Sequence, residues 1–160
     1  MELRFTYEKK EWIRGYRLYQ FIMKRITKLE LVVMALLPVI WGGMFFIEGM
    51  SMFTSILLAA LVLVYGTTGF ILFIQPELIF KKTEKYHQEY QMIFTDNTIL
   101  FETTEISSKL GWDVYSGYCE KKEFFYLLQK NVNYTLLPKR AFKTKQEEDK
   151  FRELLKKKYD

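Results

Sequence analysis

The chain has very little of the chemistry from which most enzymes and metalloproteins build their sites. It contains one cysteine, Cys119, and one histidine, His87. A single cysteine cannot form an intramolecular disulfide, and it has no second thiol with which to hold zinc or form a redox pair. We interpret Cys119 as a small side chain in a strand and His87 as a surface residue. Most metal sites and nucleophile–base pairs are thereby excluded, and we expect no metal and no cofactor.

Sequence motifs that bind nucleotides or catalytic zinc are missing as well. The chain contains no G-x-x-x-x-G-K-[ST] phosphate loop, no G-x-G-x-x-G and no H-E-x-x-H. Acidic residues occur together at Glu147, Glu148 and Asp149, but the first turn of a helix explains them, since its amide groups favour negative charge. We therefore expect that the protein is not an enzyme.

Charge is absent from two long apolar runs, residues 31–47 and 49–75. A helix of about 20 apolar residues crosses the hydrocarbon core of a bilayer. The runs predict a transmembrane hairpin at 29–75, with spans of about 29–47 and 51–75 and a tight turn at Glu48–Ser51. A cleaved signal peptide is not expected, because the first run begins about thirty residues into the chain. The alternative, two buried helices of a soluble bundle, requires charged outer faces that neither run has.

Lys and Arg residues flank the hairpin on one side only. Residues 1–28 carry eight cations against three acids, and Lys81, Lys82 and Lys85 follow the second span, whereas the turn has none. The positive-inside rule then places both termini in the cytoplasm of a multi-pass membrane protein.

Small residues in the two spans predict close helix packing. Ser51, Ser55, Ala59 and Thr67 share one face of the second span, and Ala35, Gly42 and Gly43 offer a matching hollow in the first. A polar pocket at residues 66–69 is the alternative. We favour packing, because neither span contains the ionisable residue that a transporter or proton relay needs.

Residues 1–28 read as a strand at Leu3–Tyr7 followed by an amphipathic helix. This helix either lies along lipid headgroups or leads into the first span and packs on the cytoplasmic domain. Both readings stay open.

The predicted cytoplasmic domain covers residues 81–160, and from Tyr86 onward its pattern changes to the two-residue period that is typical of strands. The pattern predicts a hairpin turned at Asp96–Asn97, a half-buried strand through Leu110, Trp112 and Val114, and a second hairpin around 131–133. A capping box at Thr144 and Glu147 begins a C-terminal helix. The fold class is thus a two-helix transmembrane hairpin plus a small cytoplasmic α+β domain, in which an antiparallel sheet is closed by that helix.

Nearly the whole chain resembles a known family in its layout, with FTYE near the start, then the hairpin, and then a characteristic C-terminal part. Its Trp-containing strand, aromatic strand and basic junction read GWDVYSGYCEKKEFFYLLQKNVNYTLLPKRAF, and a helix with F-x-x-LL follows. The segment is similar to the YcxB-like family, bacterial membrane proteins with two adjacent spans before a pleckstrin-homology-like domain. The resemblance implies that fold, a place in the bacterial cytoplasmic (inner) membrane and no established activity, and it brings no catalytic residues.

Two hypotheses for function remain. In the first, the cytoplasmic domain binds a protein partner or itself, as an adaptor or regulatory subunit. In the second, a basic surface binds anionic membrane lipids or a phosphorylated ligand. This surface consists of Lys139, Arg140, Lys143, Lys145, Lys81, Lys82 and Lys85. Nucleic acid is not expected, because the excess of positive charge lies beside the spans. We interpret the adjacent Lys139 and Arg140 primarily as solvated cations between the last strand and the helix.

Overall fold

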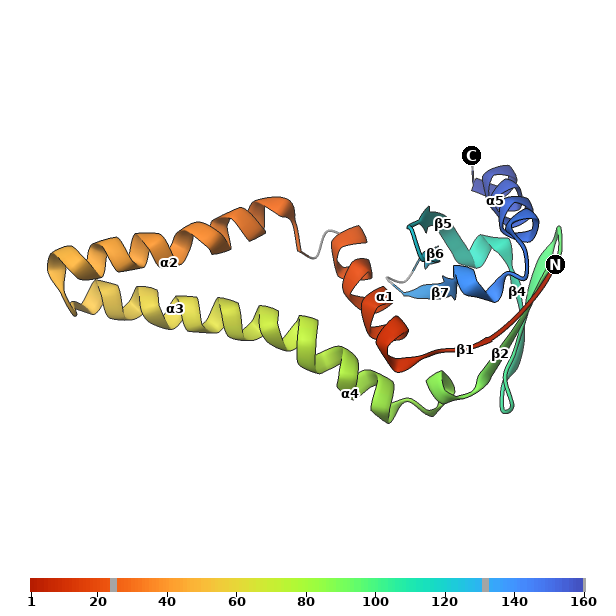
Figure 1. The fold of residues 1–160 in the computed structure, drawn as a ribbon, viewed down its shortest axis with the longest axis horizontal. Helices are drawn as coiled ribbons and strands as arrows, with labels where there is room; N and C mark the ends of the chain where they lie inside the picture. The colour runs from red at the N-terminus through yellow and green to blue at the C-terminus, as the bar shows by residue number, and fades with distance from the viewer. Residues whose placement is uncertain (24–25, 131–132, 160) are drawn as a thin grey trace. The chain divides into compact units, whose positions relative to one another are not determined.

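The computed structural model describes residues 1–23, 26–130 and 133–159. The chain forms two compact units (Figure 1). Met1–Gly15 and Thr83–Asp160 form the first, which we call the β domain, and Tyr16–Lys82 form the second, which we call the helical unit. The β domain is therefore built from two stretches of chain, one on each side of the helical unit.

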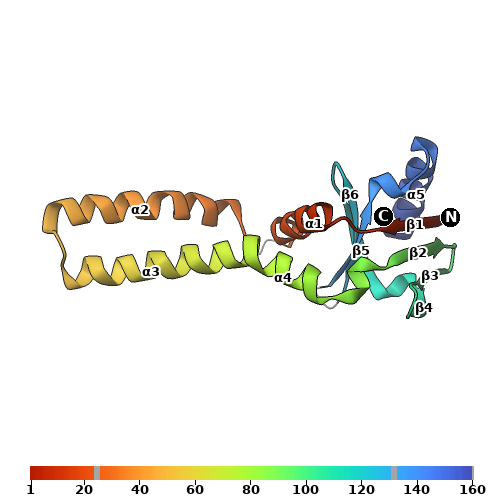
Figure 2. The same cartoon turned by 60° about the horizontal axis from the view of Figure 1, so that its bottom comes forward.

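In the described residues, the β domain contains seven strands in two antiparallel sheets (Figure 2). The first sheet has the order β1 (Glu2–Thr6), β2 (Glu89–Phe94), β3 (Thr98–Glu102) and β4 (Ser107–Gly111), and the second has the order β5 (Tyr115–Glu120), β6 (Phe124–Gln129) and β7 (Tyr134–Pro138). Strand β1 pairs with β2, with Leu3 opposite Met92 and both side chains buried. The N-terminal strand is thus a member of the domain that the sequence suggests for residues 81–160 alone.

Helix α5 (Lys145–Tyr159) follows β7 and closes one end of the β domain. The amide of Glu147 donates to Thr144 Oγ1, which confirms the predicted helix start. Phe151 is fully buried, and its ring meets those of Phe94 and Phe125 at centroid distances of 4.8 and 5.3 Å. These edge-on aromatic contacts attach the helix to both sheets at once.

The single strand predicted through Trp112 is wrong. The structure ends β4 at Gly111, continues with a short 3-10 helix at Trp112–Val114 and begins β5 at Tyr115. The buried indole of Trp112 donates from Nε1 to the carbonyl oxygen of Thr95 at 3.0 Å, so this residue marks the corner between the sheets. The hairpin at Asp96–Asn97 is confirmed by the pairing of β2 with β3. The turn predicted around 131–133 lies partly outside the described residues, although β6 and β7 flank it as expected.

Among the described residues of the helical unit, two helices are long and apolar enough to cross a membrane. They are α2 (Lys28–Glu48), with 21 residues, and a continuous helix of 31 residues at Met52–Lys82. The second consists of α3 (Met52–Gly69), a π-helical turn (Phe70–Ile74) and α4 (Gln75–Lys82). Gly49 joins α2 to α3 with a φ of 68°, a conformation that glycine adopts without strain. The first helix agrees with the predicted span at 29–47, whereas the second continues to Lys82, beyond the predicted end at residue 75.

The contact between α2 and α3 does not use the predicted small residues. Ala35, Ser55 and Ala59 are exposed, and a methyl group added at Gly42 or Gly43 would meet no atom within 4 Å. Larger side chains join the helices instead. Trp41 Nε1 donates to the Thr54 carbonyl oxygen at 3.0 Å, the Tyr65 hydroxyl donates to the Met34 carbonyl oxygen, and Leu61 is buried between them along α3.

Pro76 lies four residues after Leu72 and has no N–H to donate to the Leu72 carbonyl group, and Arg17 contacts that group instead. Its Nε donates to the carbonyl oxygen of Leu72 at 2.8 Å, and its guanidinium lies 4.8 Å from the ring centre of Phe73. Arg17 belongs to α1 (Lys9–Ile22), so this contact fixes the later part of α1 within the helical unit.

The beginning of α1 packs on the β domain, which answers the question left open for this helix up to Gly15. Trp12 and Ile13 are buried, and the hydroxyl of Tyr126 donates to the carbonyl oxygen of Gly15 at 3.0 Å. A Cβ atom at Gly15 would come within 2.5 Å of a methyl carbon of Leu136, which is itself buried. Glycine at this position allows the helix backbone to approach the Leu136 side chain this closely, whereas a larger residue requires that side chain to move.

We therefore expect Gly15→Val to lower the free energy of unfolding by about 1–3 kcal/mol, the usual cost of overpacking. Thermal unfolding of the full chain, followed by circular dichroism, measures the change. Gly117→Val is the matched control, because a Cβ atom at Gly117 meets nothing within 4 Å. Equal melting temperatures for the two variants would contradict the close approach of α1 to β7.

Candidate functional site

A cavity of about 390 Å³ lies in the β domain between the two sheets. Seven aromatic residues line it: Tyr7, Trp12, Tyr86, Tyr90, Phe101, Tyr115 and Tyr134. Tyr90 is at one end of β2, whereas Phe94, which contacts α5, is at the other, roughly 13 Å away for four residues of strand. The cavity, which we call the aromatic pocket, is thus at the end of the domain that α5 does not close.

Two strands from different sheets, β4 and β7, complete the lining of the aromatic pocket. Ser108 and Leu110 alternate along one face of β4, as expected for side chains that point inward. On β7 the consecutive residues Tyr134, Thr135 and Leu136 all line the cavity. Since neighbouring side chains of a strand point to opposite faces, three in a row mean that the cavity runs along the open edge of β7.

The aromatic rings contact one another, and these contacts hold the pocket in shape without a ligand. The centroid of the Tyr7 ring lies 4.9 Å from that of Tyr90 and 6.0 Å from that of Tyr86, and Tyr90 meets Phe101 at 5.3 Å. Trp12 and Tyr86 lie 4.7 Å apart. Tyr7 directly follows β1, Trp12 lies in α1, Tyr86 lies in a short 3-10 helix (Glu84–His87), and the other two lie in β2 and β3, so the pocket depends on both stretches of the domain.

Tyr7 ties the N-terminal stretch to the edge of β7. Its hydroxyl donates to the carbonyl oxygen of Leu136 at 2.5 Å. Burial raises the pKa of Tyr7 well above its ordinary value. Burial likewise raises the pKa of Tyr90. Both phenols are therefore neutral at physiological pH and act as hydrogen-bonding groups rather than as bases.

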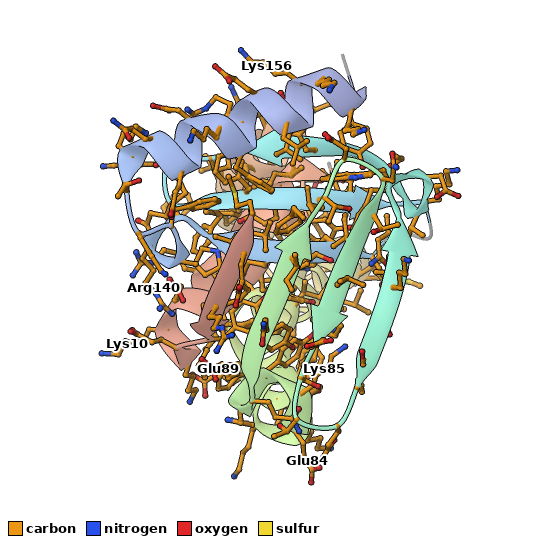
Figure 3. The ribbon with its side chains drawn as sticks, turned by 90° about the vertical axis from the view of Figure 1, so that its right-hand side faces the viewer. Lys10, Glu84, Lys85, Glu89, Arg140 and Lys156 are labelled. Atoms are coloured by element: carbon orange, nitrogen blue, oxygen red, sulfur yellow. The ribbon has the colours of Figure 1, made fainter. Side chains whose placement is uncertain are left out.

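The charge of the aromatic pocket comes from one residue. Among the described residues that line it, Lys85 is the only Lys, Arg, Asp or Glu. Its Nζ lies 5.3 Å from the ring centre of Tyr86. Figure 3 shows Lys85 among the strands of the first sheet, whereas its neighbour Glu84 points away from the domain at the bottom of the view. The pocket therefore has positive charge and, in its described lining, no carboxylate to serve as general acid or base.

The predicted basic surface is divided in the structure. Lys139 is only 17% exposed, and its Nζ contacts Glu120 at 2.5 Å and Glu148 at 3.2 Å while lying 4.8 Å from the ring centre of Phe125. Lys145 also contacts Glu148, at 2.9 Å. The interpretation of Lys139 as a solvated cation is wrong, because carboxylates of β5 and α5 neutralise it.

Arg140 is also engaged within the β domain. Its guanidinium donates to both carboxylate oxygens of Glu11 on α1, at 2.8 and 2.6 Å, and to the carbonyl oxygen of Thr6 at 2.8 Å. Such a two-pronged contact is among the stronger ion-pair geometries. Arg140 thus joins the segment after β7 to β1 and α1, and its side chain remains 43% exposed, so that it is a solvated cation with an ion-pair partner.

The remaining predicted cations lie apart from this cluster. Lys143 is exposed before α5, Lys85 lines the aromatic pocket, and Lys81 and Lys82 end α4 in the helical unit. The structure therefore does not gather the seven cations on one surface of the β domain. Within the described parts of the chain, no three His, Cys, Asp or Glu residues come close enough to hold a metal ion.

Sequence reasoning missed the aromatic pocket, although a signal for it exists. Tyr7 and Trp12 precede the apolar hairpin, and Tyr86 and Tyr90 follow it, so that aromatic residues flank the helical unit on both sides. Pairing of the two flanks would have placed these four rings together. Alternation alone does not predict that pairing, because it says nothing about which strands are neighbours.

Comparison with known proteins identifies part of the β domain. Residues 94–155 match the family model of the YcxB-like proteins, which confirms the resemblance for this segment. The match runs from the last residue of β2 into α5, and it leaves out β1, α1 and the turn before β2. No curated protein and no solved structure matches the chain significantly.

Glu120 is the centre of the ion pairs between β5 and α5. Arg152 donates to both of its carboxylate oxygens, at 2.8 and 2.7 Å, and Lys139 contacts the same group. The hydrogen bonds from Arg152, and then those from Lys139, lower the pKa of Glu120 to about 2. For Glu148, burial acts in the opposite direction, but hydrogen bonds from Lys145 and Lys139 outweigh it and lower that pKa as well.

We expect these ion pairs to make the free energy of unfolding depend on pH in the acidic range. A carboxyl group whose pKa is lowered by folding stabilises the folded state above its unfolded pKa, and this contribution is lost as the pH falls toward the folded value. The free energy of unfolding should therefore decrease as the pH falls from about 4.5 to 2. In the Glu120→Gln variant this decrease should be smaller. Urea unfolding of the full chain at several pH values measures it. Glu105→Gln, at an exposed position before β4, is the control. An equal pH dependence for wild type and Glu120→Gln would contradict the assignment.

Proposed function

From the YcxB-like match of residues 94–155 together with the aromatic pocket, we propose that this protein is a membrane-anchored, non-enzymatic interaction module. The helical unit holds the β domain at a membrane, and the β domain binds a protein partner, or a second copy, as an adaptor or regulatory subunit. The observation that carries this proposal is the preformed aromatic pocket, whose described lining contains many rings, one cation and no acid–base pair. Such a lining is suited to binding rather than to catalysis.

The β domain is pleckstrin-homology-like in this proposal. Support comes from a four-stranded and a three-stranded antiparallel sheet followed by a C-terminal helix, in which the sheets change over at Trp112–Val114. The β domain departs from a simple version of that fold in one respect. The helical unit is inserted between the segment with β1 and the beginning of α1, and strand β2.

The membrane is the cytoplasmic (inner) membrane of a bacterium in this proposal, and the β domain faces the cytoplasm. The two apolar helices support insertion, since 21 and 31 residues exceed the length that a bilayer requires. Lys81 and Lys82 in the last turn of α4, and the cations of residues 1–28, support the orientation.

Cysteine labelling tests this topology. In a Cys119→Ser background, Met50→Cys in the turn between α2 and α3 should react with a membrane-impermeant maleimide in intact spheroplasts. Glu84→Cys should react only after the membrane is opened, because it follows α4 on the cytoplasmic side. The reverse pattern, or equal labelling of both positions before permeabilisation, would be incompatible with the proposed orientation.

A photocrosslinker tests the interaction module. Ile106 lines the aromatic pocket and is 44% exposed, so a benzoylphenylalanine at this position should capture whatever the pocket region contacts in native membranes. We expect a discrete crosslinked band above the monomer, either of a partner or at twice the monomer mass. The matched control carries the crosslinker at Lys156, on α5 at the closed end of the domain (Figure 3). Identical bands from both positions, or none from Ile106, would refute partner binding at the pocket.

Contact with anionic lipid is a second candidate, and Lys81 and Lys82 favour it. Both are exposed in the last turn of an apolar helix, where each cation near an anionic leaflet contributes on the order of 1 kcal/mol. Lys139, Arg140 and Lys145 lend it less support, because carboxylates of the same domain already neutralise them. In the crosslinking experiment this candidate gives lipid adducts in place of a protein band.

A further inference from the structure

We infer that the aromatic pocket binds a small organic anion with a flat aromatic or otherwise apolar body. The inference rests on the proposed function, in that it assigns a ligand to the pocket through which the β domain is proposed to act. The anionic group lies at Lys85, and the apolar body lies among the rings of the pocket.

The size of the pocket fits a small molecule. Its volume of about 390 Å³ is within the range of roughly 300–1,000 Å³ that is usual for sites of small ligands. The rings that form it hold one another at centroid distances near 5 Å, as in the pair Tyr7–Tyr90. A preformed pocket binds a ligand without the cost of ordering its own side chains.

The walls of the pocket favour a flat, apolar body. Aromatic rings and the aliphatic side chains of Leu110 and Leu136 supply extended apolar surface. The polar groups are concentrated near β7, where the Tyr115 hydroxyl and Thr135 Oγ1 lie 3.1 Å apart and Gln129 approaches the same cavity. A ligand with an anionic group at Lys85 therefore meets apolar walls along its body and further hydrogen-bonding groups near β7.

The sign of the charge decides between an anion and a cation. Aromatic cages also bind quaternary ammonium groups, but Lys85 would repel such a ligand. Acidic residues near Lys85 in the sequence do not offset its charge within the pocket. Glu84 points away from the domain, and Glu89 lies on the exposed face of β2, whose buried face carries Tyr90 (Figure 3). An anion gains an ion pair with Lys85, and the neutral phenols add no opposing charge.

Two probes of equal shape and opposite charge test this inference. The full chain, in nanodiscs of zwitterionic lipid, is titrated by calorimetry with 2-naphthoate and with 2-naphthylmethylammonium, and empty nanodiscs give the background. We expect naphthoate to bind and the ammonium probe to bind at least tenfold more weakly. Lys85→Gln should weaken naphthoate about fivefold, which corresponds to about 1 kcal/mol for an exposed ion pair.

The control for charge is Lys109→Gln, because Lys109 is an exposed residue of β4 between Ser108 and Leu110, both of which line the pocket. It should leave naphthoate binding unchanged. Ser108→Trp fills the pocket and should abolish binding, and circular dichroism shows whether this variant folds. If it does not, the Lys85 and Lys109 pair still decides the result, since both side chains are exposed.

Equal binding of the two probes would overturn the inference, and so would naphthoate binding that neither Lys85→Gln nor a folded Ser108→Trp changes. Absence of naphthoate binding also overturns it. The proposed function fails separately, when the crosslinker at Ile106 captures no partner. A captured partner without naphthoate binding leaves the interaction module standing and removes only the anion.

Discussion

The pairing of β1 with β2 is the contact on which the rest of the β domain depends. Leu3 lies opposite Met92, and the stacked rings of Phe5 and Tyr90, 5.5 Å apart, continue the contact toward the aromatic pocket. Because β1 is fixed there, Tyr7 reaches the carbonyl oxygen of Leu136 and α1 begins against β7. Without this pairing, the pocket would lose two walls that the segment matching the YcxB-like family does not contain.

A second set of contacts closes the opposite end of the domain. Phe151 joins both sheets through apolar contact, and Glu120 holds Arg152 of α5 and Lys139 beside it in one network. Charged groups at such a junction cost free energy to desolvate, so their value depends on complete pairing. Ion pairs and apolar packing therefore close the end of the domain that carries α5, whereas the aromatic pocket at the other end remains available for a ligand.

Local sequence patterns predicted the individual helices and strands of this fold better than they predicted which of these elements lie next to one another. The apolar runs, the hairpin at Asp96–Asn97 and the start of α5 at Thr144 were predictable, since each depends on adjacent residues. The partner of β1, the corner at Trp112 and the ion pairs of Lys139 were not, because they join segments far apart in the chain. The sequence pattern also did not predict that Ser55 and Ala59 are exposed, for a related reason. Spacing places them on one face of a helix but does not say which face meets α2.

The insertion of the helical unit between Thr6 and Glu89, which pair at one end of the first sheet, has a consequence for biosynthesis. A ribosome releases β1 long before β2 exists, so the N-terminal strand has no partner while the apolar helices emerge. Antiparallel return of the chain through α2 and α3 shortens the effective loop that β1 and β2 must close, and it thereby lowers the entropy cost of their meeting. The helical unit is therefore synthesised in full before β2, and the first sheet is completed only after both apolar helices have been made.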